Sequence, residues 1–230
     1  MTSGYPRMKN HGTFSTAAAM NTFLTNHNVS SGKPTDIMVG DYFTLTIGSN
    51  SYTVYIAGID TEYNKGSTAL ATHHITCITN FGNSKMNNTD TTTGGYASAT
   101  VMQNFLSGKA TEISGVLSSH LLTRSTLLTN SVGSDGKSNS WNWVDKQLTL
   151  LSETQIYGSI QWGNVYDTGE GYEKLPIFNE LTPLQLFGRT YIWLRGVYSA
   201  TAFCGAGGDG VPNSYGASIS VAAVALFTIG

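Results

Sequence analysis

An alternating pattern of apolar and polar residues, beginning just after Asp41, constrains this chain more than any other feature. Residues 42–47 and 52–57 both alternate with a period of two, which is the spacing of a strand with one buried face. The intervening residues 48–51, Gly-Ser-Asn-Ser, are typical of a tight turn. The pattern predicts an antiparallel hairpin, so the fold must contain a sheet.

Helical spacing near the start of the chain predicts a first helix that ends at Asn26. Ser15 can cap this helix, and we assign residues 1–36 to an N-terminal arm. Two interpretations stay open: the helix docks on a neighbouring molecule, or it packs on the core of its own domain. Three apolar residues share one face of the helix: Met20, Phe23 and Leu24.

Two further helices are predicted in the middle of the chain. Apolar residues recur at helical spacing on either side of residues 107–109, Ser-Gly-Lys, and we expect a break there because Gly is unfavourable inside a helix. The apolar positions are Val101, Phe105, Leu106, Ile113, Val116, Leu117 and Leu121. One helix is therefore expected before the break and one after it.

Residues 123–190 form a long stretch with little periodicity, rich in Gly, Asn and Ser. An ordered loop region of this length usually carries function. After it, residues 191–195 and 221–229 are predicted strands, with a glycine-rich turn at Gly205–Gly210 between them. The chain is therefore predicted to be an α+β, β-rich domain over residues 37–230, with two helices and a long loop region.

The composition argues against several classes of function. Only 11% of residues are charged and the net charge is −2, which leaves no basic footprint for nucleic acid. No apolar run reaches the roughly 18 residues that a membrane span needs, and residues 1–10 lack the pattern of a secretory signal. We expect no nucleic acid partner and no membrane insertion. A polar, weakly charged surface suits a protein that is packed in a large assembly or exposed outside a cell.

Several short motifs occur in order over roughly residues 40–230: Ala57–Asp60, His74-Ile75, Thr92–Tyr96, Leu151–Glu153, Gln155–Gly158, Leu175–Phe178, Trp193-Leu194-Arg195 and Phe203-Cys204. Together they resemble a family of phage and prophage virion proteins of Gram-positive bacteria with a C-type-lectin-like C-terminal region. The chain departs from the family at residues 222–227, where Ala-Ala-Val-Ala-Leu-Phe replaces the usual Gly-Val-Arg-Pro-Ala-Phe. We expect a changed edge contact there.

The resemblance implies a C-type-lectin-like domain and a location on the virion surface. Lectin-like domains bind sugars, proteins or only their own assembly, so the fold alone does not determine the function. We expect a non-enzymatic virion structural protein, as a capsid decoration or a fibre component. Its expected partners are other virion proteins, further copies of itself in a homo-oligomer, and a host-surface glycan or protein. The alternatives are a tail or fibre adhesin that recognises a cell-surface glycan and, with less support, a cell-wall glycan hydrolase.

The tryptophans of the long loop region are the preferred binding surface, because aromatic rings stack on sugars and amides supply hydrogen bonds beside them. The alternative for each loop tryptophan is that it plugs the loop onto the core. Trp193, in a predicted strand, is assigned to the core. The candidate ligand-binding residues are Trp141, Asn142, Trp143, Trp162, Asn164, Tyr166 and Tyr215.

No catalytic residue, metal ligand or cofactor is expected. Pro212-Asn213 lacks the flanking carboxylate or amide of calcium-dependent lectins. His73 and His74 are adjacent, so in a strand they point to opposite faces and cannot readily share one metal ion. Cys77 and Cys204 fit no metal spacing, and we expect two buried free thiols, with a disulfide as the alternative.

Carboxylates in two places keep the hydrolase alternative open. Asp60 and Glu62 share a face if the backbone is extended there, and a second group consists of Asp167, Glu170 and Glu173. A glycan hydrolase needs two carboxylates about 5 to 10 Å apart in a cleft. Turn formation around Gly169 explains the second group equally well. Arg195, in a predicted strand, is expected to pair with a carboxylate.

Overall fold

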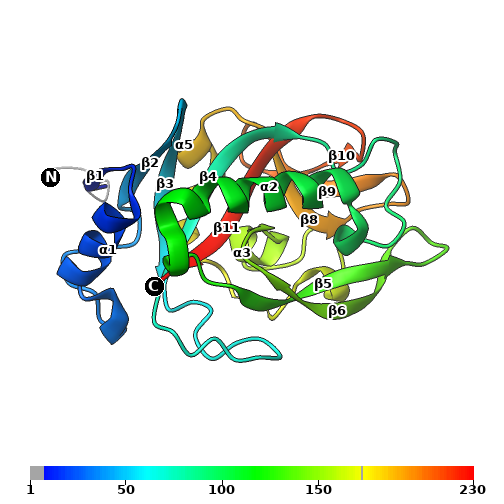
Figure 1. Ribbon diagram of the computed structural model, residues 1–230. Coiled ribbons are helices and arrows are strands. Elements are labelled where there is room, and N and C mark those ends of the chain that lie inside the picture. The colour runs from blue at the N-terminus through cyan, green and yellow to red at the C-terminus, as the bar shows by residue number, and fades with distance from the viewer. Residues whose placement is uncertain (1–7, 172) are drawn as a thin grey trace, which may run out of the picture.

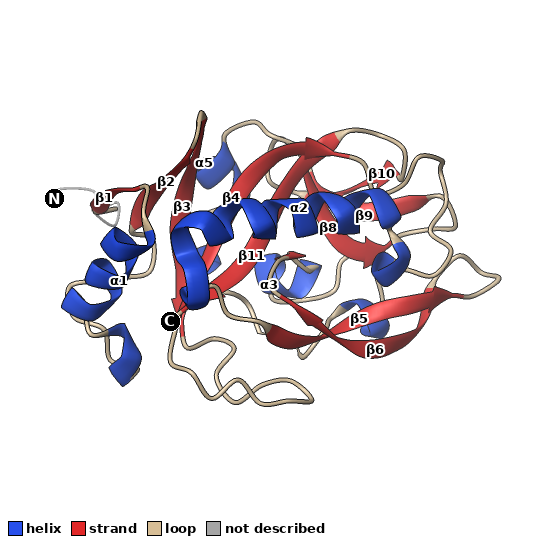
Figure 2. Ribbon diagram, viewed as in Figure 1, coloured by secondary structure: helices blue, strands red, loops and turns tan. Residues whose placement is uncertain are grey.

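The computed structural model describes residues 8–171 and 173–230 and has a mixed α+β arrangement dominated by strands (Figure 1, Figure 2). In this part of the chain nine strands form one sheet, and two more form a separate hairpin. In spatial order the sheet contains β1 (Asn10–Phe14), β2 (Tyr42–Ile47), β3 (Asn50–Ile59), β4 (Ile75–Ser84), β11 (Val221–Ile229), β8 (Ile192–Val197), β9 (Ala202–Ala206) and β10 (Pro212–Gly216), while β7 (Thr149–Leu150) pairs with β11 beside this path.

The hairpin predicted from the alternating pattern is confirmed. β2 and β3 pair antiparallel, with Phe43 opposite Val54 and Leu45 opposite Tyr52. All four of these side chains are buried, and the residues between them in β2 face the other way. The period of two in the sequence therefore marks the core-facing side of the first two central strands.

The first helix, α1 (Ala17–Asn26), packs on the core of its own chain. Thr16 rather than Ser15 caps it, because Thr16 Oγ1 accepts a hydrogen bond from the backbone N–H of Ala19 at 3.2 Å. The preceding strand β1 pairs in parallel with β2. Residues 10–26 of the predicted arm thus share the sheet and the core with the residues that follow them. The buried side chains of the helix are Met20, Phe23 and Leu24.

A single helix, α2 (Thr100–Leu117), occupies the place of the two helices that we predicted, and it lies along one face of the sheet (Figure 1). The predicted break was wrong, because the helix continues through Gly108. Burial of one apolar face outweighs the roughly 1 kcal/mol that an interior Gly costs. Among the described residues, neither α2 nor any other helix is long and apolar enough to cross a membrane. The buried residues of α2 are Met102, Leu106, Ala110, Ile113, Val116 and Leu117.

Apolar side chains cover both faces of the sheet. α1 and α2 contribute to one core, and α3 (Glu153–Tyr157), α4 (Ile177–Glu180) and α5 (Pro183–Phe187) contribute to the other. β11 lies between β4 and β8, and all nine of its residues are buried. The prediction of a changed edge contact at residues 222–227 was therefore wrong, because these residues lie in a central strand of the sheet. Apolar side chains alternate there between the two cores, as a central strand requires.

Residues 123–190 contain more regular structure than we predicted. A hairpin of β5 (Arg124–Val132) and β6 (Ser138–Lys146) lies beside the main sheet, with the short helix η4 (Val165–Asp167) against it (Figure 2). Both faces of β6 carry polar residues and are at least partly exposed along most of the length of the strand. A strand of this kind has no clear apolar alternation, and this explains why the pattern did not reveal it.

Several predicted core residues are confirmed. Trp193 is fully buried, and its Nε1–H donates a hydrogen bond to the carbonyl oxygen of Ser84 at 2.8 Å. Cys77 and Cys204 are free and buried. Burial raises the pKa of both thiols, so both stay protonated and unreactive at neutral pH.

Candidate functional site

Aromatic side chains gather where the β5–β6 hairpin meets the loop after α3. Trp141 and Trp143 are two residues apart in β6 and so share one face of that strand. The ring centroids of Trp141 and Tyr166 are 5.3 Å apart, and those of Trp162 and Tyr198 are 4.9 Å apart. Trp143, Trp162 and Tyr198 are 44%, 38% and 39% exposed. We call this group the aromatic surface: Trp141, Trp143, Trp162, Tyr166 and Tyr198.

Glu153, the first residue of α3, fixes the loop that carries Trp162. Its buried carboxylate accepts hydrogen bonds from the backbone N–H groups of Gln161 at 3.1 Å, Trp162 at 3.1 Å and Gly163 at 2.9 Å. Three successive donors around one anion form a compact nest. Ser152 begins α3 with a capping box, which fixes the start of the helix that carries Glu153. The exposed indole of Trp162 therefore extends from a fixed backbone.

A second buried carboxylate, Asp167, ties the same loop to the hairpin and to the sheet. It accepts hydrogen bonds from Ser138 Oγ at 2.7 Å, Thr129 Oγ1 at 3.0 Å, the backbone N–H of Val197 at 3.2 Å and that of Asn164 at 2.9 Å. Burial raises the pKa of Asp167, and these four donors partly offset the rise. Strands β5, β6 and β8 thus meet at one side chain beside the aromatic surface.

Lys137, in the turn between β5 and β6, joins Trp162 to Tyr198. Its Nζ lies 4.8 Å from the centroid of the Tyr198 ring, and it donates hydrogen bonds to the carbonyl oxygens of Trp162 at 3.3 Å and Tyr198 at 2.5 Å. A cation over an aromatic face is a favourable contact. We did not predict Lys137 or Tyr198 as site residues, because they are 61 positions apart and meet only in the folded chain.

The two predicted amides differ in position. Asn142 is exposed but pairs across the hairpin with Leu128, so it lies on the opposite face of β6 from the tryptophans. Asn164 caps η4: its Oδ1 accepts a hydrogen bond from the backbone N–H of Tyr166 at 3.0 Å, and its Nδ2 donates to the carbonyl oxygen of Ser138. The amide of Asn164 therefore holds the loop in place.

The structure does not bring Tyr215 together with the other predicted site residues. Tyr215 lies on β10, and its ring contacts Trp193 at 5.6 Å and Tyr191 at 5.9 Å, measured between centroids. Its hydroxyl donates a hydrogen bond to the carbonyl oxygen of Ala206 at 3.1 Å. Tyr215 belongs to a different surface from that of the loop tryptophans.

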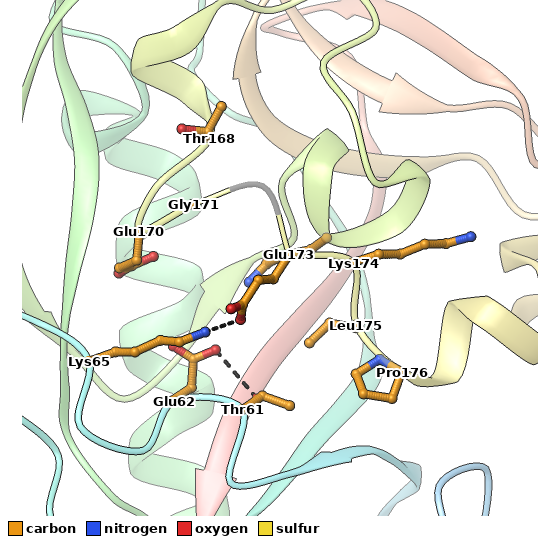
Figure 3. A pocket seen from close by; sticks show the side chains of 11 residues that line it. Thr61, Glu62, Lys65, Thr168, Glu170, Gly171, Glu173, Lys174, Leu175 and Pro176 are labelled. Atoms are coloured by element: carbon orange, nitrogen blue, oxygen red, sulfur yellow. Dashed lines mark hydrogen bonds and ion pairs between the residues drawn. The ribbon is translucent and has the colours of Figure 1, made fainter.

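A polar pocket of about 270 Å³ brings three of the predicted carboxylates together (Figure 3). Glu62 comes from the loop after β3, and Glu170 and Glu173 come from the loop before α4. Glu173 is exposed and forms an ion pair with Lys65 across the pocket. Asp60 and Asp167, the other two predicted carboxylates, do not line this pocket.

Two buried arginines neutralise the inner carboxylates of the pocket. Arg195 lies 3.8 Å from Glu170, which confirms its predicted pairing with a carboxylate, and Arg124 lies 3.8 Å from Glu62. Burial acts to raise the pKa of Glu170, but the guanidinium groups of Arg195 and Arg124, together with hydrogen bonds, outweigh burial and hold that pKa below its ordinary value. Glu170 is therefore ionised at neutral pH.

The adjacent histidines make structural contacts around Asp60. The carboxylate of Asp60 lies 2.7 Å from His73 Nδ1 and accepts a hydrogen bond from the backbone N–H of His74 at 2.8 Å. The His73 ring stacks on Tyr63 at 4.4 Å. Burial lowers the pKa of His74, so its imidazole is neutral at pH 7. Over residues 8–171 and 173–230, no group of three or more His, Cys, Asp or Glu side chains could hold a metal ion.

Comparisons with protein-family models, with curated proteins and with solved structures gave no match. The function therefore has to be inferred from the two sites. Each of the three carboxylates of the pocket is paired with an arginine or a lysine, whereas Trp143 and Trp162 of the aromatic surface are open to solvent. The aromatic surface is the stronger candidate for contact with another molecule.

Proposed function

We propose that this protein is a non-enzymatic structural protein displayed on the surface of a phage particle, as a capsid decoration or a fibre component. Its weakly charged faces contact neighbouring virion proteins, and its aromatic surface attaches to the host surface. The proposal includes a C-type-lectin-like fold. In support, a hairpin (β2–β3), a helix (α2), a long loop region and closing strands (β8 to β11) follow in that order, with one helix where that layout has two.

The observation that carries the proposal is the exposure of Trp143 and Trp162 on firmly held backbone. Exposed indole rings lose unfavourable contact with water when a partner covers them. Glu153 and Asp167 fix the loop of Trp162 by accepting hydrogen bonds from seven backbone and hydroxyl donors, so little ordering remains to be done on binding. Rigid aromatic anchors of this kind are common in binding surfaces.

The same exposure favours the adhesin alternative, in which the partner is a cell-surface glycan. An indole has a flat apolar face that packs against the C–H groups of a sugar ring. Trp143 and Trp162 lie on different segments, one on β6 and one after α3, so they can contact successive units of a chain-like ligand. An adhesin needs the protein to be at a fibre or tail tip, whereas a decoration protein coats the capsid.

The polar pocket gives less support to the hydrolase alternative. A general acid that works near neutral pH needs a raised pKa. The pKa of Glu170 is lowered instead, and Glu173 is exposed and paired with Lys65. The buried carboxylates balance Arg124 and Arg195, which is a structural use of their charge.

Binding of the fluorescently labelled protein to Gram-positive cell walls, and to polysaccharide released from those walls, tests the proposal. We expect Trp143→Ala and Trp162→Ala each to weaken binding by about tenfold or more, as for anchor residues of other interfaces. Met38→Ala is the control, because Met38 is 71% exposed and lies outside the aromatic surface. Equal binding by the three variants and the wild type would contradict the proposed role of the aromatic surface.

A further inference from the structure

A groove of about 580 Å³ lies where β4, β8 and β11 meet the end of β10, and Tyr215 lines it. None of the residues of the aromatic surface lines this groove. The volume is within the usual range of small-molecule sites, roughly 300 to 1,000 Å³. The groove is lined by polar, aromatic and apolar side chains, including those of Asn80, Asn83, Arg189, Tyr191, Tyr215 and Ile219.

Tyr191 provides an exposed flat ring at the rim of the groove. It is 57% exposed, and the edge of its ring meets the Tyr215 ring at 5.9 Å with an interplanar angle of 69°. Tyr215 in turn rests on the fully buried Trp193. Ile219, 51% exposed, adds apolar surface to the same groove. A supported tyrosine face beside a hollow can pack against one face of a sugar ring.

Two side chains around this ring, Arg189 and Asn80, keep hydrogen-bond donors without partners in the described chain. Arg189 is exposed and forms no ion pair with any described residue. Asn80 Oδ1 accepts a hydrogen bond from the backbone N–H of Gly82 at 2.9 Å, which leaves its Nδ2 as the group open to a ligand. No carboxylate of the described residues lines the groove. A ligand rich in acceptors and carrying negative charge fits this arrangement.

One carboxylate lies on the other side of Tyr191. Asp209 lines an adjoining hollow together with Arg189 and Tyr191, and its Oδ1 accepts a hydrogen bond from the backbone N–H of Val211 at 3.2 Å. Asp209 is thus occupied in shaping its own turn. Its negative charge makes the adjoining hollow less favourable for an anionic ligand than the groove of Tyr215, which no described carboxylate lines.

We propose that the groove of Tyr191 and Tyr215 binds an acidic saccharide, a sugar that carries a carboxylate or a phosphate group. The ring of Tyr191 packs against the sugar, and the guanidinium of Arg189 pairs with the anionic group, for which its planar fork is well suited. The amides of Asn80 and Asn83 donate hydrogen bonds to sugar oxygens. This site is separate from the aromatic surface, so it can be tested whether or not the proposed function is correct.

Calorimetric titration of the whole protein with three probes tests the proposal: tetragalacturonic acid, its neutral methyl ester, and N-acetylglucosamine 6-phosphate. We expect at least one acidic probe to bind, at least about tenfold more tightly than the neutral ester, and to bind more weakly as salt is raised. Binding of the uronate alone or of the sugar phosphate alone would identify which anionic group the groove takes. Failure of both acidic probes to bind at millimolar concentration, or equal binding of the ester, would overturn the proposal.

Variants separate this groove from other surfaces. Arg189→Gln should abolish the preference for acidic probes, and Tyr191→Ala should weaken binding by about tenfold, whereas Tyr191→Phe should retain it. Met38→Ala, at an exposed position outside both the groove and the aromatic surface, should leave the titration unchanged. All three groove substitutions are at exposed positions, and circular dichroism will confirm that each variant is folded. Acidic-probe binding that is insensitive to Arg189→Gln would place the ligand elsewhere and overturn the proposal.

Discussion

Trp162 donates its backbone N–H to both carboxylate oxygens of Glu153, at 3.1 Å each. Glu153 is only 4% exposed, whereas the side chain that projects from this fixed backbone belongs to a residue that is 38% exposed. A buried charge therefore determines the position of a surface aromatic group. This relationship distinguishes the aromatic surface from an ordinary flexible loop. A substitution of the buried Glu153 should therefore disturb the aromatic surface without replacing any of its residues.

Glu153→Gln should loosen the loop of the aromatic surface. The substitution removes the charge that three backbone donors share, and we expect a loss of about 2 kcal/mol in the free energy of unfolding. Hydrogen exchange at residues 161–163 should become faster, as measured by mass spectrometry. Glu173→Gln, at an exposed carboxylate, is the control and should change stability by less than about 0.5 kcal/mol. Unchanged exchange at residues 161–163 would show that Glu153 does not hold the loop.

Replacement by Ala should reduce the free energy of unfolding strongly at the core residue Trp193 and weakly at the surface residue Trp143. Trp193 is fully buried and Trp143 is 44% exposed. Trp193→Ala should reduce the free energy of unfolding by about 3 to 5 kcal/mol, because it leaves a cavity and an unpaired carbonyl at Ser84. Trp143→Ala should cost less than about 1 kcal/mol. Urea denaturation measures both, and similar losses for the two variants would contradict the assignment.

Glu170→Gln should produce a stability difference that depends on pH. The pKa of Glu170 is lowered in the folded protein, so its ion pair with Arg195 stabilises the fold above the unfolded-state pKa. As pH falls through the lower folded-state pKa, wild-type Glu170 becomes protonated and this stabilisation disappears. The wild type should exceed the variant by roughly 3 kcal/mol at pH 7. The gap should shrink below the ordinary pKa of 4.5, and a gap that is constant with pH would argue against the pairing.

Gly108→Ala should stabilise the protein by about 0.5 to 1 kcal/mol, because Gly108 lies inside α2 and no other group lies near the added methyl. Gly95→Ala should destabilise it, since Gly95 has a φ of +63° and a Cβ there would come within 2.4 Å of Thr129. Thermal unfolding measures both effects: the unfolding temperature should rise for Gly108→Ala and fall for Gly95→Ala. Destabilisation by Gly108→Ala would mean that the helix is interrupted there after all.

Features with a local signature could be predicted from the sequence. The hairpin of residues 42–57 followed from strict alternation, because each second residue faces the core. Trp193 and its neighbour Arg195 followed from their place in an apolar strand, where a tryptophan is buried and a guanidinium requires a carboxylate. In each example the sequence pattern that supports the prediction lies within a few residues along the chain.

Features that depend on distant contacts could not be predicted. β6 has polar residues on both faces, so its sequence shows no sustained apolar alternation that would predict a strand paired with β5. α2 continues through Gly108 because the sheet buries one of its faces. The meeting of Lys137 with Tyr198, and the separation of Tyr215 from the loop tryptophans, likewise depend on strand order in the folded chain. The sequence therefore indicated candidate site residues, but it did not show which of them lie together in the folded chain.

Cryo-electron microscopy of intact particles of the phage that encodes this protein tests the central claim most directly. The proposed function predicts density for the chain on the outer surface of the particle, with Trp143 and Trp162 facing away from the particle. A position on the capsid shell would identify a decoration protein, and one at a fibre tip would identify an adhesin. Absence of the chain from the particle, or burial of Trp143 and Trp162 against the subunits beneath, would contradict the proposed role of the aromatic surface.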